Sequence, residues 1–284
     1  MLGPSKRAFS GALSHVYYGI GYIATSGIGY WVPDWQDFTM VIVILIALGI
    51  LLFPFFPESA AWQFSRERYA AGRKNLHHFA KKTDTKLDDA LIDDVVEDIK
   101  NQRNERTDER SFSIVDLFRR KNLRSITFAV GVSFLVNTMV YYGLSYNAAQ
   151  LPGSLYVNNA VNGVLETLAY VACLWLLDLF GRRMMLGWCM IAGGACCLSS
   201  MALLEVDEMT SVMEEAAKWL SFGGKLFISA SFCTVYVFSA ELYPTDIRTI
   251  GVGCGSMFGR IGGFAAPLMI EVQFIDGMSL CVIE

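Results

Sequence analysis

Residues 156–183 constrain the fold more than any other part of the chain, because they form an apolar segment long enough to cross a lipid bilayer. Asn158, Asn162, Glu166 and Tyr170 nevertheless follow one another at four-residue intervals within this segment. That spacing places the four polar side chains on one face of a helix. A carboxylate that faces lipid costs at least about 2.5–3.5 kcal/mol. The polar face is therefore expected to point into a protein interior or a water-filled cavity.

The composition indicates an integral membrane protein. Of the 284 residues, 54% are hydrophobic and only 18% are charged, whereas soluble domains carry about 25% charged residues. The sequence contains no basic motif with interleaved aromatic residues, so nucleic-acid binding is not expected. It also lacks a catalytic triad, a metal-binding set and a phosphate loop, so no enzyme and no cofactor are implied. The seven cysteines lack metal-ligand spacing and are expected to be small buried hydrophobic residues.

Seven apolar segments predict an all-α membrane protein. We expect membrane-spanning helices at about residues 11–30, 38–56, 124–147, 157–180, 184–204, 218–240 and 249–270. Glycines in the first segment are expected to allow close helix packing. The second segment is almost purely Val, Ile, Leu and Phe, and it is expected to face lipid.

The predicted spans divide the chain into four regions. Residues 1–59 contain two spans, residues 60–123 form a cytoplasmic loop with amphipathic helices, residues 124–270 contain five spans, and residues 271–284 are an atypical tail. Within the loop, apolar residues at helical spacing among acidic ones predict a surface helix; they are Leu87, Ala90, Leu91, Val95, Val96 and Ile99. The acidic residues are expected to form a solvated face rather than a metal site.

The positions of lysine and arginine predict the orientation in the membrane. If the seven spans alternate, Lys6, Arg7 and the loop fall on the same side as Arg182 and Arg248. Acidic residues predominate on the other side. The basic side is therefore predicted to be cytoplasmic, with the N-terminus of this chain inside.

Polar and aromatic side chains within the spans are candidates for a substrate site. Aromatic rings supply apolar contact and cation–π attraction, a carboxylate attracts a cationic group, and a guanidinium binds a carboxylate by two hydrogen bonds. The candidate substrate-binding residues are Asn137, Tyr141, Tyr142, Asn162, Glu166, Tyr170, Lys225, Tyr236 and Arg260.

Each of these candidates also has a purely structural interpretation. Glu166 and Arg260 would suit an interhelical hydrogen bond or a structural ion pair. Lys225 lies close enough to a helix end for its ammonium group to reach the membrane interface. The tyrosines alone would be ordinary packing residues, and they gain interest because they share helix faces with charged groups.

Two charged turns follow predicted spans on the cytoplasmic side. Residues 178–183 read DLFGRR, and residues 241–248 read ELYPTDIR. Gly181 permits a tight turn, and Asp178 can pair with a neighbouring arginine or cap a helix N-terminus. Opposite charges that meet at such a turn can close one face of a transporter and release it. The candidate gating residues are Asp178, Gly181, Arg182, Arg183, Glu241 and Arg248.

Together with PESAAW at residues 57–62 and YYGLSYN at residues 141–147, these turns resemble motifs of the major facilitator superfamily. They are most similar to its organic cation, organic anion and carnitine transporter family, solute carrier family 22. The resemblance covers residues 3–270 and implies about seven transmembrane helices, the fifth to the eleventh of the family fold. A sugar-porter-like transporter is the second alternative, because sugar porters share the PES, GRR and Glu-x-x-Pro motifs but have a Gln-Gln signature that is absent here.

The resemblance implies secondary-active or facilitative transport of small organic ions by alternating access in the plasma membrane. Glu166 matches a glutamate of the cation and carnitine branches, and Arg260 matches an arginine of the anion and carnitine branches. The presence of both favours an organic cation or a carnitine-like zwitterion as substrate. The implied partners are this small organic ion and the lipid bilayer, with a coupling ion and a full-length relative as further candidates.

Several features of the family are missing from the sequence. They include the first four helices, the large outer loop and a regular twelfth helix. These departures predict a fragment, a truncated gene model or a short isoform. They also leave open an alternative function, in which a truncated, non-transporting membrane protein regulates a full-length relative.

Overall fold

The computed structural model describes residues 7–82, 92–94, 96–98, 113–149, 151–204, 210–244 and 247–281. The regular elements of these residues are helices: α1 (Arg7–Trp31), α2 (Trp35–Leu52), the 3-10 helix η2 (Phe53–Phe55), α3 (Ala60–Ser65), α4 (Tyr69–Lys82), α6 (Ile114–Arg119), α7 (Lys121–Asn147), α8 (Leu155–Phe180), α9 (Arg182–Leu204), α10 (Ser211–Leu242) and α11 (Arg248–Cys281). They confirm the predicted all-α class. The chain forms two compact units, Met1–Pro33 with Phe112–Glu284 and, separately, Asp34–Ser111.

Five helices among the described residues are long and apolar enough to cross a membrane. They are Trp35–Phe55, Lys121–Asn147, Leu155–Phe180, Arg182–Leu203 and Ser211–Leu242. α1 and α11 are also long enough, but both are rich in glycine, which lowers their mean hydropathy and is common in membrane helices. The membrane-spanning role of α1 and α11 stays a prediction.

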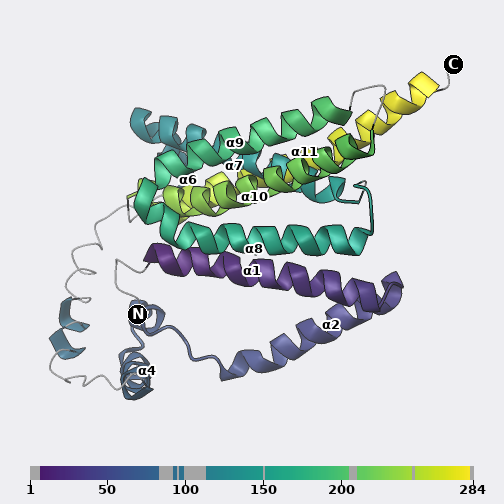
Figure 1. Ribbon diagram of the computed structural model, residues 1–284. Coiled ribbons are helices and arrows are strands. Elements are labelled where there is room, and N and C mark those ends of the chain that lie inside the picture. The colour runs from purple at the N-terminus through teal and green to yellow at the C-terminus, as the bar shows by residue number, and fades with distance from the viewer. Residues whose placement is uncertain are drawn as a thin grey trace. The chain divides into compact units, whose positions relative to one another are not determined.

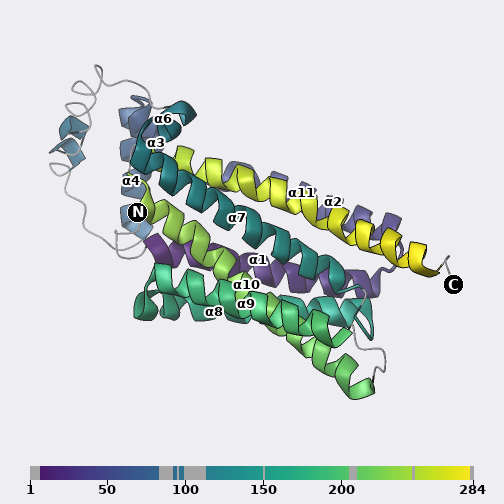
Figure 2. The ribbon, with the colours of Figure 1, turned by 90° about the horizontal axis from the view of Figure 1, so that it is seen from above.

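α10 is the central helix of the larger unit and has two apolar faces. One face packs with α8 and α9 around Tyr170, Cys173 and Cys233. The other face packs with α6, α7 and α11 around Phe134 and Val235. Figures 1 and 2 show the long helices of this unit lying side by side. α1 completes the arrangement by packing against α8 and α10, so five helices, α1, α7, α8, α10 and α11, surround the interior that holds the candidate site.

Glycines allow α1 and α8 to approach closely. A Cβ atom at Gly19 of α1 would collide with Thr167 of α8. In return, a Cβ atom at Gly163 of α8 would lie 2.9 Å from the ring of Tyr22 and 2.8 Å from the side chain of Ile23. Small residues at such positions let two helix backbones meet. The predicted packing role of the α1 glycines is therefore confirmed at Gly19.

Two other glycines of α1 do not share this role. Added Cβ atoms at Gly21 and Gly27 would meet no atom within 4 Å. Close packing is instead extensive between α7 and α11, where Gly255 faces Phe134 and Gly259 faces Thr138.

Two helix ends differ from the sequence prediction. The helix predicted at residues 38–56 ends at Leu52, because Pro54 has no N–H group and its ring crowds the preceding turn; a 3-10 turn, η2, takes its place. At the other end of the chain, α11 continues to Cys281. Residues 271–281 contain no proline, and one glycine costs a helix only about 1 kcal/mol. These residues therefore extend the last helix instead of forming the predicted separate tail.

The smaller unit contains α2, α3 and α4. No residue of α2 is buried, in keeping with the expected lipid-facing helix. α3 contributes Ala60 and Phe64 to a small core that also contains Ile92 and Val96. Val96 thus has the predicted apolar environment. The remaining predicted residues of that helix face, Leu87, Ala90, Leu91, Val95 and Ile99, lie outside the described residues.

The described cysteines have the predicted environment in most cases. Cys173, Cys189, Cys233 and Cys254 are buried, and the six described cysteines are free thiols. Four of the six therefore act as small apolar residues between helices.

Candidate functional site

The polar stripe of α8 faces the protein interior. Asn158, Asn162, Glu166 and Tyr170 are all buried, as their four-residue spacing predicts. Asn158 has a structural role, because its Nδ2 donates a hydrogen bond to the Leu151 carbonyl at 3.1 Å and so anchors the connection between α7 and α8.

Glu166 is fully buried, with an exposed fraction of 0%. Its Oε1 accepts hydrogen bonds from the hydroxyl of Tyr141 on α7 at 2.7 Å and from the hydroxyl of Tyr170 on α8 at 2.5 Å. Its Oε2 has no hydrogen-bond partner among the described residues. Two tyrosines therefore stabilise one carboxylate oxygen, and the second oxygen is left for a charged neighbour.

That neighbour is Lys225 of α10, whose Nζ lies 3.9 Å from Glu166 Oε2. Lys225 is 1% exposed, and its Nζ donates to Ser145 Oγ at 2.6 Å. The ammonium group also lies over the ring of Tyr141, 3.2 Å from the ring centroid. Lys225 therefore does not reach a membrane interface, which was one interpretation of its sequence position. It forms a buried ion pair that links α8 to α10. Its contacts with Ser145 and Tyr141 also join α7 to this pair.

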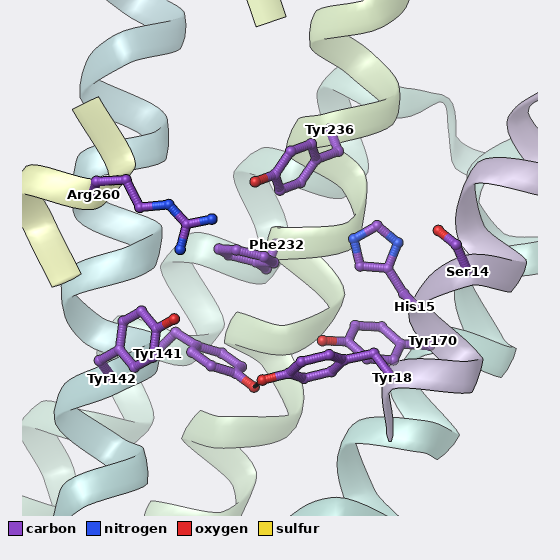
Figure 3. Close-up of a pocket in the computed structure, with 9 residues that line it drawn as sticks. All are labelled: Ser14, His15, Tyr18, Tyr141, Tyr142, Tyr170, Phe232, Tyr236 and Arg260. Atoms are coloured by element: carbon purple, nitrogen blue, oxygen red, sulfur yellow. Dashed lines mark hydrogen bonds between the residues drawn. The ribbon is translucent and has the colours of Figure 1, made fainter. Parts of the chain in front are cut away.

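A cavity of about 280 Å³ lies beside this ion pair. Figure 3 shows the side chains that line it, which come from α1, α7, α8, α10 and α11: Ser14, His15, Tyr18, Tyr141, Tyr142, Tyr170, Phe232, Tyr236 and Arg260. Tyr141 and Tyr170 have a double role, because each lines the cavity and donates its hydroxyl to Glu166. The carboxylate therefore lies directly behind the aromatic wall.

Arg260 lines the cavity from α11 and is exposed. The structure places Lys225 beside Glu166, so Arg260 is not the ion-pair partner of this carboxylate. No carboxylate among the described residues pairs with Arg260. Its five N–H donors are thus available to an anionic group that enters the cavity.

The structure brings five of the nine sequence-derived candidates to the cavity wall, namely Tyr141, Tyr142, Tyr170, Tyr236 and Arg260. Glu166 and Lys225 lie behind this wall. Asn162 is buried elsewhere on the α8 stripe. Asn137 donates from Nδ2 to the Ser133 carbonyl at 2.9 Å, and its Oδ1 is buried and accepts no hydrogen bond from any residue that the structure describes.

Sequence reasoning missed the contribution of α1 to this cavity. Ser14, His15 and Tyr18 of α1 all line it. The hydroxyls of Tyr18 and Tyr141 lie 3.4 Å apart. The available signal was His15, since an ionisable residue within a membrane segment is itself a reason to suspect a functional site.

Three of the candidate gating residues, Asp178, Arg182 and Glu241, meet where α8 and α10 end and α9 begins. Arg182 Nη2 lies 3.3 Å from Asp178 Oδ1, and Arg182 Nε lies 3.1 Å from Glu241 Oε2. Gly181 has a φ of +77°, a backbone conformation that glycine adopts without strain. The predicted pairing of Asp178 with a nearby arginine is therefore confirmed, and one arginine joins three helix ends.

The other two arginines of the proposed gate do not join this network. Arg183 is exposed. Arg248 has a buried Nε without a hydrogen-bond partner among the described residues. Asp246 lies outside the described residues.

Comparison with known proteins identifies the family. A model of the sugar (and other) transporter family matches residues 4–279. The organic cation transporter protein of Drosophila melanogaster is 31% identical over 273 residues, which cover 95% of this chain and 48% of the relative. Solute carrier family 22 member 15 of Xenopus tropicalis is 30% identical over 275 residues, 96% of this chain and 50% of the relative. The human organic cation/carnitine transporter 2 is 28% identical over 278 residues, 97% of this chain and 48% of the relative.

The chain spans about half the length of the curated relatives that it matches. These relatives are transporters rather than enzymes, and they favour the organic-ion group over the sugar porters. The match extends over nearly the whole chain, including the helices that form the cavity. The relatives that it matches carry the names of organic cation transporters, organic cation/carnitine transporters and members of solute carrier family 22. The chain therefore belongs to the sugar (and other) transporter family of the major facilitator superfamily.

Proposed function

We propose that this chain takes part in the transmembrane transport of small organic ions, and that a zwitterion with separate cationic and anionic groups is its preferred substrate. The observation that carries the proposal is the aromatic cavity with Arg260 on its wall and Glu166 directly behind Tyr141 and Tyr170. A carboxylate on the substrate would bind the free guanidinium. The substrate's cationic group would bind against the aromatic rings, which attract cations through their π faces.

The buried ion pair supports an alternating-access mechanism. In this arrangement Lys225 occupies the face of the Tyr141 ring and neutralises Glu166. A cationic group that reached Glu166 would have to displace either Tyr141 or Lys225. Such a change would alter the contacts among α7, α8 and α10, so substrate binding and helix rearrangement would be coupled.

We further propose that the chain lies in the plasma membrane as a multi-pass protein with its N-terminus in the cytoplasm. Support comes from lysine and arginine residues around the predicted inner helix ends, including Arg182 and Arg183. A full-length relative is a further proposed partner, since the relatives that match are about twice as long as this chain. A coupling ion is also a proposed partner.

Uptake by the purified chain in proteoliposomes tests the proposed function. We expect saturable uptake of a small zwitterion. Because a charge-assisted hydrogen bond contributes about 1.5–3 kcal/mol, Arg260→Ala should weaken uptake of carboxylate-bearing substrates about 10- to 100-fold. Arg260→Lys should retain part of the activity, since it keeps the charge but loses the second hydrogen bond.

Two results would contradict this function. One is normal uptake of carboxylate-bearing substrates by Arg260→Ala. The other is the finding that the chain reaches the membrane and shows no uptake of its own, but changes the uptake rate of a co-expressed full-length relative. The second result would support the regulatory alternative.

The gating proposal predicts that substitutions of Arg182 and Arg183 have different effects on the uptake rate. Arg182→Gln should change the uptake rate several-fold, because it removes the contacts of Arg182 with Asp178 and Glu241. Its effect on stability should stay below about 1 kcal/mol, since both pairs are partly exposed and screened by solvent. Arg183→Gln is the matched control and should change neither quantity. Uptake is measured in proteoliposomes, and stability is measured by thermal unfolding in detergent. Equal uptake rates for the two variants would exclude a gating role for Arg182.

A further inference from the structure

We propose that His15 makes the cavity selective for cationic groups that carry an N–H donor, that is, for protonated amines over quaternary ammonium groups. This inference rests on the proposed function and narrows its substrate class. It concerns a residue of α1 that lines the cavity wall.

The hydrogen bonds of α1 determine which nitrogen of His15 carries the proton. The Gly11 carbonyl lies 3.1 Å from His15 Nδ1 and also accepts a hydrogen bond from Ser14 Oγ at 2.6 Å. A carbonyl oxygen can only accept, so Nδ1 must be the donor. In the neutral ring, Nε2 then has a free lone pair. No described residue donates a hydrogen bond to this nitrogen.

Three aromatic rings surround the imidazole. The ring centroid of His15 lies 5.3 Å from that of Tyr170, 5.7 Å from that of Tyr236 and 6.5 Å from that of Phe232. Figure 3 shows His15 projecting from α1 towards Phe232, with Arg260 on the opposite side of that ring. An ammonium group attracted to these rings would therefore find the Nε2 lone pair as its hydrogen-bond acceptor.

The charges around the cavity favour the same placement. Arg260 repels a cation from its own side of the cavity. Glu166 lies behind Tyr170, one of the rings that pack against His15. A zwitterion would accordingly place its carboxylate at Arg260 and its ammonium group at His15.

A protonated amine and a quaternary ammonium group would interact differently at this position. The amine donates its N–H to Nε2. The quaternary group presents a methyl group, so it makes no hydrogen bond and still removes water from the lone pair. His15 is half-buried, so the quaternary group would leave its acceptor nitrogen covered and without a hydrogen bond. A site with such an acceptor discriminates against a ligand that lacks the matching donor.

The experiment compares the binding of two matched zwitterions to the purified chain by calorimetry. The compounds are 4-(dimethylamino)butanoate and 4-(trimethylammonio)butanoate, which differ only by the exchange of an N–H for an N–CH3 group. At about pH 8, where free imidazole is neutral, we expect the N–H compound to bind about tenfold or more tightly.

Variants of α1 assign this preference to His15. His15→Phe keeps an aromatic ring but removes the acceptor, and it should reduce the preference to less than about twofold. His15→Gln supplies a carbonyl acceptor and should restore part of it. Tyr17→Phe is the matched control, because Tyr17 is 68% exposed and does not line the cavity; it should leave the preference unchanged.

Each adverse outcome has a distinct meaning. Equal binding of the two compounds by the wild-type chain, or tighter binding of the quaternary one, would overturn this inference alone. A preference that survives in His15→Phe would do the same. If neither compound binds, the proposed zwitterion site is wrong, and the inference fails with it.

Discussion

Replacing Lys225 with methionine is expected to destabilise the protein by about 3–5 kcal/mol, the cost of leaving a buried charge without its partner. Lys225 Nζ is the charged group beside Glu166 Oε2, at 3.9 Å, and both side chains are inaccessible to solvent. Without the ammonium group, two tyrosine hydroxyls would be left to stabilise a buried carboxylate. Thermal unfolding in detergent measures the loss.

A double-mutant cycle tests whether the loss comes from the ion pair. Glu166→Gln removes the charge, so the double variant with Lys225→Met should regain about 1–3 kcal/mol relative to the sum of the single variants. Lys218→Met is the control on the same helix, because Lys218 forms no ion pair with the described residues; it should change stability by less than about 1 kcal/mol. Additive single-variant effects would show that the two charges are independent.

The same variants also distinguish structural from functional importance. A purely structural ion pair predicts that the double variant recovers transport along with stability. Under the proposed function, the double variant recovers stability but still transports poorly, because the charges that respond to substrate are gone. This comparison addresses the two interpretations that the sequence left open for Glu166.

The sequence predicted well those features that depend on local periodicity. Long apolar runs are visible residue by residue, so the helices around Glu166 and Tyr141 were expected near their observed positions. The four-residue spacing of polar side chains likewise predicted that one face of α8 is buried. Both features follow from the geometry of a single helix.

Contacts between helices could not be predicted in the same way. Nothing in the spacing around Lys225 indicates that its ammonium group lies on the Tyr141 ring, because the two residues are far apart in the chain. The role of α1 was hidden for a related reason. His15 is one polar residue among glycines and tyrosines, and only the packing of α1 against α8 and α10 brings it to the cavity.

Helix ends were the other source of error, and each has a local cause. Pro54 ended α2 earlier than its apolar run suggested. In α11 the opposite occurred, since Asp276 and Gly277 were too weak a signal to stop the helix. Hydropathy measures which residues suit a membrane, whereas backbone chemistry determines where the helix stops.

The packing of α7 on α11 leads to the second large effect, at Gly262. A Cβ atom at Gly262 would collide with the backbone carbonyl oxygen of Leu135. A backbone atom cannot move aside as a flexible side chain can, so the two helices would have to separate. We therefore expect Gly262→Ala to cost about 3 kcal/mol, the upper end of the range for overpacking, when thermal unfolding is measured in detergent.

Gly253→Ala provides the matched control on the same helix. A Cβ atom at Gly253 would meet no atom within 4 Å, and alanine favours a helix over glycine by about 0.5–1 kcal/mol. Gly253→Ala should therefore leave the stability unchanged or raise it slightly, although the chemical substitution is identical. A similar stability for the two variants would contradict the close approach of α7 and α11. Because Arg260 lies on α11 two residues before Gly262, Gly262→Ala should also displace the guanidinium from the cavity and weaken carboxylate-dependent uptake, an effect that Gly253→Ala should not share.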